Sequence, residues 1–182
     1  MKVVIGLGNP GKEYERTRHN VGFLILDALA LHHRATFTTK RSLEAEIAEV
    51  ITDGQKRLLL VKPQTFMNAS GRTFSQICSK YPVLPEDFLI VYDDADLPFG
   101  NLRLKHGGGS AGHRGMESIL TNVPRGTTMT RLRVGIGRPP YSDMPLDEFV
   151  LGRWTKQEET TLRELTPKTI ELIEKTLLQK IV

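Results

Sequence analysis

The chain has 182 residues, of which 39 % are hydrophobic and 25 % are charged, and these values exclude a disordered or fibrous protein. No apolar run approaches the ~20 residues of a membrane-spanning helix, and the apolar start of the chain is too short for a signal peptide, so we expect a cytoplasmic protein. The single cysteine, Cys78, excludes an internal disulfide and a cysteine-cluster metal site.

The first half of the chain alternates between strand and helix patterns. Residues 3–7 form an apolar run that predicts a buried strand, and Gly8-Asn9-Pro10-Gly11 predicts a tight loop after it. A broadly apolar stretch predicts a helix over residues 20–33. Residues 44–51 alternate between apolar and polar, and an Asp-Gly pair and then residues 57–61 follow them, a pattern that predicts a β-hairpin.

The second half continues the alternation. The expected elements are helices over residues 71–81 and 113–122, and strands over residues 88–92, 101–105 and 132–136. Apolar residues recur at helical spacing after Thr155, and we expect Thr166-Pro167 to begin a new helix there, because threonine caps helices and proline fits the first turn. Together these patterns predict a single α/β domain over residues 1–182, with a mixed sheet that is antiparallel at the hairpin.

Positive charge is concentrated in one part of the chain. The formal net charge is +4, but residues 101–140 hold seven basic residues and one acidic residue, a net charge of +6. A basic block on an otherwise near-neutral protein favours a polyanionic partner such as nucleic acid, although a solvated arginine-rich surface would give the same count.

The first loop contains a G-x-G-x-x-G pattern, Gly6-Leu7-Gly8-Asn9-Pro10-Gly11, which is typical of dinucleotide-binding proteins. Two features argue against that function. Residues 12–19 lack the apolar periodicity of the helix that should hold the pyrophosphate, and the nearest acid at the required distance, Asp27, lies inside a helical pattern. The glycines still indicate a sharp turn or a close approach of the backbone.

Four polar residues could form a catalytic site. Asn9 and His19 flank the first loop, Asn68 follows the hairpin, and Asp93 follows the strand at residues 88–92. Ligands gather beyond the carboxyl ends of strands in α/β sheets, so these residues could converge there. A histidine can take a proton from water, a carboxylate can orient it, and amides can stabilise an oxyanion. Because no serine or cysteine stands out as a nucleophile, the set favours direct attack by water.

Each of these residues also has a structural interpretation. His19 could be a surface histidine, and Asn9 and Asn68 could serve turns or a helix cap. Asp93, Asp94 and Asp96 could bind Mg²⁺ or Ca²⁺, but the residues between them interrupt the group and we do not favour a metal site.

Six segments together resemble the motifs of the bacterial peptidyl-tRNA hydrolase family, in order and with the family's spacing. They are GLGNPG at residues 6–11 followed by Tyr14, TRHNVGF at 17–23, KPQTFMNASG at 62–71, DDADLPFG at 93–100, GGGSAGHRG at 107–115 and RLRVGIGRP at 131–139. The resemblance implies a hydrolase that cleaves the ester between peptide and tRNA and recycles tRNA from stalled or prematurely released translation. It also implies a monomeric, three-layer α/β/α domain around a twisted mixed sheet, with a C-terminal helix, no cofactor and no metal.

The resemblance implies a role for each matching residue. His19 would be the general base that activates water, and Asp93 would hold and polarise it. Asn9 would contact the substrate near the ester and help to select blocked aminoacyl groups. Asn68 would bind the substrate and steady the transition state, while Met67 would line the peptide site.

Other matching residues would bind the acceptor end of tRNA. Tyr14 and Phe66 would contact the end of the RNA, and Lys105 and Arg133 would clamp phosphates, in agreement with the basic block. His113 lies at the start of a predicted helix, and it could either bind the substrate or have a packing or capping role.

The chain departs from the family at one position of the site. Arg114 follows His113 where the family usually has asparagine, so an amide that donates and accepts becomes a cation that only donates. We expect Arg114 to contact the RNA backbone or its 3′ end. The main alternative for the whole chain is a non-catalytic RNA-binding protein of the same fold; a nucleotide-dependent oxidoreductase and a metal-dependent hydrolase are less favoured.

Overall fold

The fold is built on one seven-stranded sheet with the strand order β2-β3-β4-β1-β5-β7-β6. A computed structural model describes residues 1–52, 56–124 and 126–178. The strands are β1 (Lys2–Gly6), β2 (Thr38–Lys40), β3 (Ala45–Thr52), β4 (Lys56–Pro63), β5 (Phe88–Asp94), β6 (Leu102–His106) and β7 (Thr130–Gly135). The helices are α1 (Val21–His32), α2 (Ser70–Lys80), α3 (Arg114–Leu120), α4 (Leu146–Leu151) and α5 (Lys156–Leu178).

The sheet is mixed, and its parallel centre determines where the loops meet. Strands β4, β1, β5 and β7 run parallel, whereas β2–β3, β3–β4 and β6–β7 pair antiparallel. The carboxyl ends of β1, β4 and β5 therefore lie at one edge of the sheet. The first loop and the residues that follow the hairpin reach this edge together with the end of β5.

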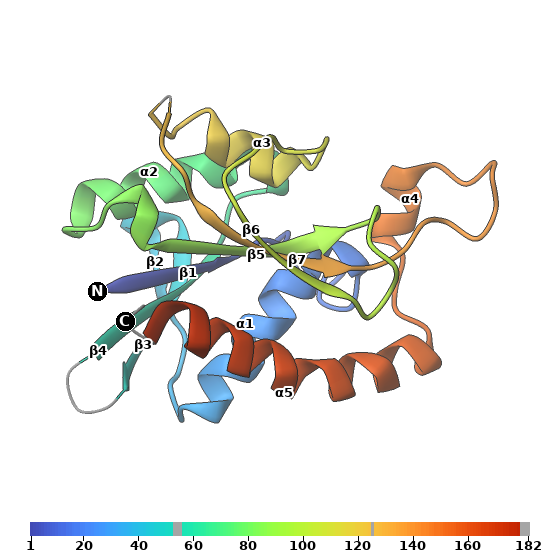
Figure 1. Cartoon of the computed structure of the whole chain (residues 1–182), viewed down its shortest axis with the longest axis horizontal. Coiled ribbons are helices and arrows are strands. Elements are labelled where there is room, and N and C mark those ends of the chain that lie inside the picture. Colours follow the sequence, from blue (N-terminus) through green and yellow to red (C-terminus); the bar gives the residue numbers. More distant parts are fainter. Residues whose placement is uncertain (53–55, 125, 179–182) are drawn as a thin grey trace.

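Helices cover both faces of the sheet, which gives three layers (Figure 1). Helices α1 and α5 lie on one face, and α2 and α3 lie on the other. Alternate residues of the central strands pack into two separate cores: in β5, Leu89 and Val91 face α1 and α5, and Ile90 and Tyr92 belong to the opposite core. Because both faces of this strand are covered, β5 is hydrophobic from Phe88 to Tyr92, before its two acidic residues.

A close backbone approach joins α1 to the sheet. A Cβ added at Gly22, the second residue of α1, would lie 2.5 Å from both the backbone N and O of Leu7 and 2.5 Å from the backbone O of Val91. Glycine at this position therefore lets the start of α1 contact β5 and the residue that follows β1. His19, three residues earlier in the chain, is carried by this contact to the end of β5.

The structure confirms the predicted strands and helices, with small shifts at their ends, and it confirms the mixed α/β sheet with a C-terminal helix. Strand β5 runs on through the acidic residues to Asp94. Two short elements were not predicted from the sequence: strand β2 and helix α4, which are three and six residues long. The predicted turn at residues 53–54 and one member of the basic block, Arg125, lie outside the described residues.

The prediction that Thr166-Pro167 begins a new helix was wrong, because α5 is one helix with Pro167 inside it. Proline removes one backbone donor, but the helix keeps its buried stripe of Leu162, Leu165 and Ile173 on the core. The hydroxyl of Thr166 donates to the carbonyl of Leu162 at 2.6 Å, so it bonds within the helix instead of capping a new one. Among the described residues, no helix is both long and apolar enough to cross a membrane.

The Gly22 contact yields a test of this packing. Gly22→Ala is expected to lower the free energy of unfolding by about 1–3 kcal/mol, because the added methyl group must displace backbone atoms of two neighbouring segments. Urea unfolding measures the change. Gly109→Ala is the matched control, since an added Cβ there meets nothing within 4 Å. Equal stability of Gly22→Ala and the wild type would contradict the close approach.

Candidate active site

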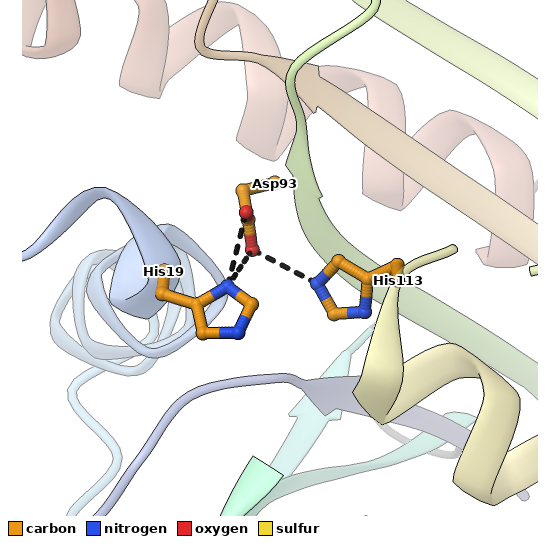
Figure 2. A group of neighbouring side chains, drawn as sticks. All are labelled: His19, Asp93 and His113. Atoms are coloured by element: carbon orange, nitrogen blue, oxygen red, sulfur yellow. Dashed lines mark hydrogen bonds and ion pairs between the residues drawn. The ribbon is translucent and has the colours of Figure 1, made fainter. Parts of the chain in front are cut away.

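The centre of the site is a hydrogen-bonded contact between the imidazole of His19 and the carboxylate of Asp93 (Figure 2). His19 lies in a short 3-10 helix, Arg18–Asn20, directly before α1, and Asp93 lies at the end of β5. His19 Nδ1 lies 2.9 and 3.0 Å from the two carboxylate oxygens of Asp93. The Asp93 side chain is 3 % exposed and the His19 side chain 11 % exposed. With Nδ1 donating to Asp93, the lone pair of His19 lies on Nε2, on the opposite side of the ring.

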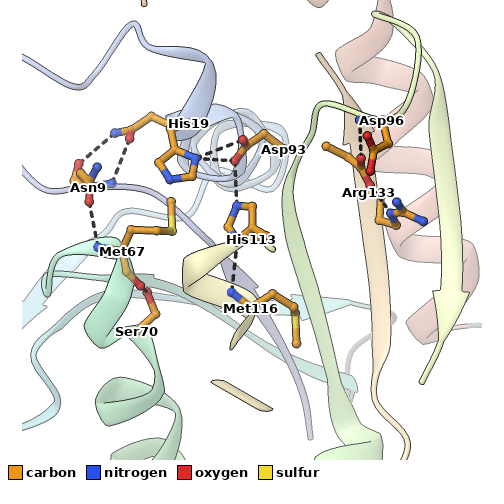
Figure 3. Close-up of polar contacts among 11 residues, drawn as sticks. Asn9, His19, Met67, Ser70, Asp93, Asp96, His113, Met116 and Arg133 are labelled. Carbon is orange, nitrogen blue, oxygen red and sulfur yellow. Dashed lines mark hydrogen bonds and ion pairs between the residues drawn. The ribbon is translucent and has the colours of Figure 1, made fainter. Parts of the chain in front are cut away.

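A second histidine reaches the same carboxylate from the other face of the sheet. His113 Nε2 lies 3.0 Å from Asp93 Oδ1. As the N-cap residue of α3, His113 also accepts a hydrogen bond at Nδ1 from the backbone N–H of Met116, at 3.2 Å (Figure 3). Because Nδ1 accepts, the proton of neutral His113 is on Nε2 and points at Asp93. The sequence left open whether His113 caps a helix or belongs to the site, and in the structure His113 does both.

The environment keeps Asp93 ionised. Burial alone would raise the pKa of its carboxyl, but the His19 and His113 rings beside it lower the pKa more, so it lies well below the ordinary value. Asp93 is therefore a carboxylate at neutral pH, with two imidazole donors on it. A buried carboxylate of this kind can orient His19 and stabilise a positive charge that forms on its ring.

The 3-10 helix that carries His19 is anchored by Arg18. The guanidinium donates to both carboxylate oxygens of Glu158, at 2.9 and 3.0 Å, and stacks 4.4 Å from the centre of the Phe149 ring. The Arg18 side chain is 10 % exposed, so this paired contact is partly desolvated. The role of Arg18, which directly precedes His19, was not predictable from the sequence because its partner Glu158 is 140 residues away.

Asn9 is fixed by a reciprocal pair of bonds with Asn20. The backbone N–H of Asn9 donates to Asn20 Oδ1, and Asn20 Nδ2 donates to the backbone O of Asn9, both at 2.9 Å. The side-chain Oδ1 of Asn9 accepts from the backbone N–H of Met67 at 2.8 Å (Figure 3). Since Oδ1 is engaged, the side-chain NH₂ of Asn9 is directed away from Met67 and is left as a donor for a ligand. This bond also ties the loop after β1 to the segment that contains Asn68.

These residues line a cavity of about 340 Å³. The polar residues in its lining include Asn9, His19, Asn68, Asp93 and His113. Helix α4 adds the apolar residues Leu146, Val150 and Leu151, which were not predicted from the sequence to belong to the site. A pocket lined by both polar and apolar side chains fits a ligand that has a reactive polar group and an organic side chain.

Aromatic residues lie at the rim of the cavity. Phe66 lines the pocket and is 61 % exposed. Tyr14 packs edge-on against it, with ring centroids 6.5 Å apart. Tyr14 is half-buried, so the exposed ring of Phe66 is the main surface of this pair on which a nucleic-acid base can stack.

The basic residues of the site have distinct partners. Arg133 pairs with Asp94, and Arg138 pairs with Asp96, while Arg114 reaches Asp147 of α4 at 2.6 Å. Lys105 is exposed and lies directly across from Arg131 in the β6–β7 ladder. Neither Lys105 nor Arg133 lines the cavity, so the predicted phosphate contacts lie outside it.

The acidic run at the end of β5 does not act as one cluster. Asp94 and Asp96 face arginines, whereas Asp93 faces the two histidines. Ligand atoms of His19, Asp93 and His113 do lie within 4.8 Å of one another, close enough to hold a metal ion. An ion there would displace the two protons that link the histidines to Asp93.

Comparison with known proteins identifies one family. A family model described as Peptidyl-tRNA hydrolase matches residues 3–182. A peptidyl-tRNA hydrolase of Chloroflexus aggregans is 45 % identical over 176 residues, covering 96 % of this chain and 91 % of its own length. That of Rickettsia africae is 41 % identical and covers 90 % of this chain and 86 % of its own. The crystal structure of peptidyl-tRNA hydrolase from Acinetobacter baumannii matches with a TM-score of 0.89 and 31 % identity, over 97 % of this chain and 88 % of that one.

The contacts of His113 predict its protonation state. In ¹⁵N-labelled protein at neutral pH, His113 is expected to be the neutral Nε2–H tautomer, because Nδ1 accepts from Met116 and Nε2 donates to Asp93. Two-bond ¹H–¹⁵N spectra of the imidazole rings measure this directly. His19 is expected to show the opposite tautomer, with the proton on Nδ1. Finding the proton of His113 on Nδ1 would contradict the arrangement.

Proposed function

This chain belongs to the peptidyl-tRNA hydrolase family and hydrolyses peptidyl-tRNA, and we propose that His19 is the general base of that reaction. The observation that carries the proposal is the double contact of His19 Nδ1 with the carboxylate of Asp93, at 2.9 and 3.0 Å. It fixes the tautomer that leaves Nε2 basic, in a ring that lines the cavity.

In the proposed mechanism, His19 Nε2 takes a proton from water as the water oxygen attacks the ester carbonyl carbon. The carbonyl oxygen becomes an oxyanion, and Asp93 stabilises the imidazolium that forms. When the tetrahedral intermediate collapses, the bond to the ribose oxygen breaks and the imidazolium returns the proton to that oxygen. The products are the peptide acid and free tRNA, and His19 is again neutral.

Two amides and the apolar residues that line the cavity would hold the substrate. The NH₂ group of Asn9, directed by the bond from Met67, would donate to a carbonyl oxygen near the ester, and Asn68 at the cavity surface would donate to the developing oxyanion. Met67 and the apolar residues of α4 would receive the peptide side chain. A substrate with a free amino group has no amide carbonyl for Asn9 to contact, so N-blocked substrates would bind in preference to it.

The tRNA would leave the cavity past the aromatic rim. We place the 3′ end of the RNA against Tyr14 and Phe66, where bases can stack. Lys105 and Arg133 would contact phosphates, with the larger contribution from Lys105, because Asp94 already offsets the charge of Arg133. His113 would act on the reaction through Asp93, and the protein would work as a monomer in the cytoplasm.

A non-catalytic RNA-binding protein is the less favoured alternative. Such a protein has no chemical need for a histidine oriented by a buried carboxylate at the wall of a cavity. The dinucleotide alternative lacks its main structural element, since Gly11 is followed by turns up to the 3-10 helix Arg18–Asn20, where the motif requires a helix.

His19 and Asp93 can be tested by kinetics with N-acetyl-aminoacyl-tRNA in EDTA. His19→Ala is expected to lower kcat by roughly 10²–10⁴-fold with little change in KM, because only the proton-transferring group is lost. Asp93→Asn is expected to lower kcat by a similar factor, since an amide can donate to Nδ1 and favour the wrong tautomer. His106→Ala, a histidine outside the cavity, is the control. A His19→Ala variant with wild-type kcat would refute the general base.

Arg114 offers a separate test of RNA binding. We propose that Arg114 exchanges its exposed ion pair with Asp147 for an RNA phosphate when the substrate binds. Arg114→Ala is then expected to raise KM and to reduce the slope of log KM against log salt by about one. Asp147→Asn removes the competing carboxylate and is expected to lower KM. The proposal fails if both variants keep the wild-type KM and salt slope.

A further inference from the structure

A second cluster of metal-binding side chains lies far along α1 from the active site. His32 is the last residue of α1, and His33 is its C-cap residue. Both rings face Glu174 of α5: Glu174 Oε1 lies 2.7 Å from His33 Nε2 and 4.0 Å from His32 Nε2. Figure 1 shows α1 and α5 on the same face of the sheet, and the two helices are in direct contact.

We propose that His32, His33 and Glu174 bind one divalent transition-metal ion of the zinc class, with water completing its coordination. Potential ligand atoms of the three residues lie within 4.8 Å of one another. Two imidazoles and one carboxylate are a donor set that suits zinc. Zinc binds such nitrogen and oxygen atoms at about 2.0–2.2 Å. With these lengths, tetrahedral ligands stand roughly 3.3 Å apart. The 2.7 Å contact therefore opens slightly, and the 4.0 Å contact closes.

The proton balance of the site allows this change. Nε2 of His33 now shares a proton with Glu174, and coordination needs its lone pair, so neutral His33 moves its proton to Nδ1. The His32 side chain is 58 % exposed and can rotate toward the ion at little cost, whereas the His33 side chain is 18 % exposed and already held in place.

The surroundings favour a cation. The site lies at the carboxyl end of α1, where the aligned backbone carbonyls give a partial negative charge. In the described part of the chain, the ion pairs of Glu174 are with these two histidines, without a lysine or arginine that would compete with a metal ion. Exposed carboxylates elsewhere in the protein, such as Asp147 and Asp96, are paired with arginines.

The ion would join two helices that also meet near the catalytic histidine. Helix α1 begins directly after the 3-10 helix of His19, and α5 carries Glu158, the partner of Arg18. A metal ion between His33 and Glu174 would connect the distant ends of the same pair of helices. Because the ligands do not line the catalytic cavity, the expected effect is on stability and not on hydrolysis.

The test uses the full chain without a histidine tag, titrated with ZnCl₂ after treatment with a chelator. Calorimetry is expected to give one ion per chain, and zinc at about 100-fold above Kd is expected to raise Tm by roughly 5–10 °C. Glu174→Gln keeps the size of the side chain but loses the charge, and it is expected to weaken binding at least 10-fold and to remove the Tm shift. His33→Ala should behave in the same way, while His106→Ala should bind as the wild type does.

Hydrolysis measured in the same titration separates this site from the catalytic one. Unchanged activity at saturating zinc, together with the loss of binding in Glu174→Gln, would support the proposal. Zinc that inhibits hydrolysis and still binds Glu174→Gln with the wild-type Kd would place the ion at His19, Asp93 and His113 and overturn it. The absence of any zinc binding by the wild type would also overturn it. None of these outcomes depends on whether His19 is the general base.

Discussion

The site depends on one buried carboxylate, Asp93, which receives an N–H donor from each of two histidines. A buried charge is costly unless hydrogen bonds replace its water, and these two rings supply that replacement. Each ring comes from a different face of the sheet: His19 precedes α1, and His113 caps α3. The end of β5 is where the two layers come within reach of one side chain.

The surrounding packing serves to hold these two rings in place. Gly22 lets α1 approach the sheet at backbone distance, and Arg18 ties the 3-10 helix of His19 to Glu158 at the start of α5. On the other face, the Met116 N–H fixes the tautomer of His113, so the direction of its proton follows from the start of α3. The geometry of the candidate site therefore rests on helix termini, which the three-layer fold brings to one edge of the sheet.

Much of this arrangement was predictable from the sequence. Asn9 and Asn68 follow strands and Asp93 lies at the end of one, and the carboxyl ends of these strands share an edge, so their convergence on the cavity follows from the order of strands and helices. The pairs Arg133–Asp94 and Arg18–Glu158 join residues that lie far apart in the chain, so local patterns do not reveal them. The helix α4 was missed for another reason, since six residues are too few to show helical periodicity. The prediction of a helix boundary at Pro167 was wrong because the burial of α5 outweighs one lost backbone hydrogen bond.

Chemical rescue tests the central claim, that His19 acts as a base held by Asp93, most directly. A His19→Gly variant leaves a space in the cavity wall beside Asp93, and added imidazole can enter it from the pocket. The hydrolysis rate of this variant is expected to rise with imidazole concentration, and the rise is expected to disappear in the double variant His19→Gly/Asp93→Asn. A rate that imidazole does not change, with the variant folded and still binding tRNA, would contradict the account.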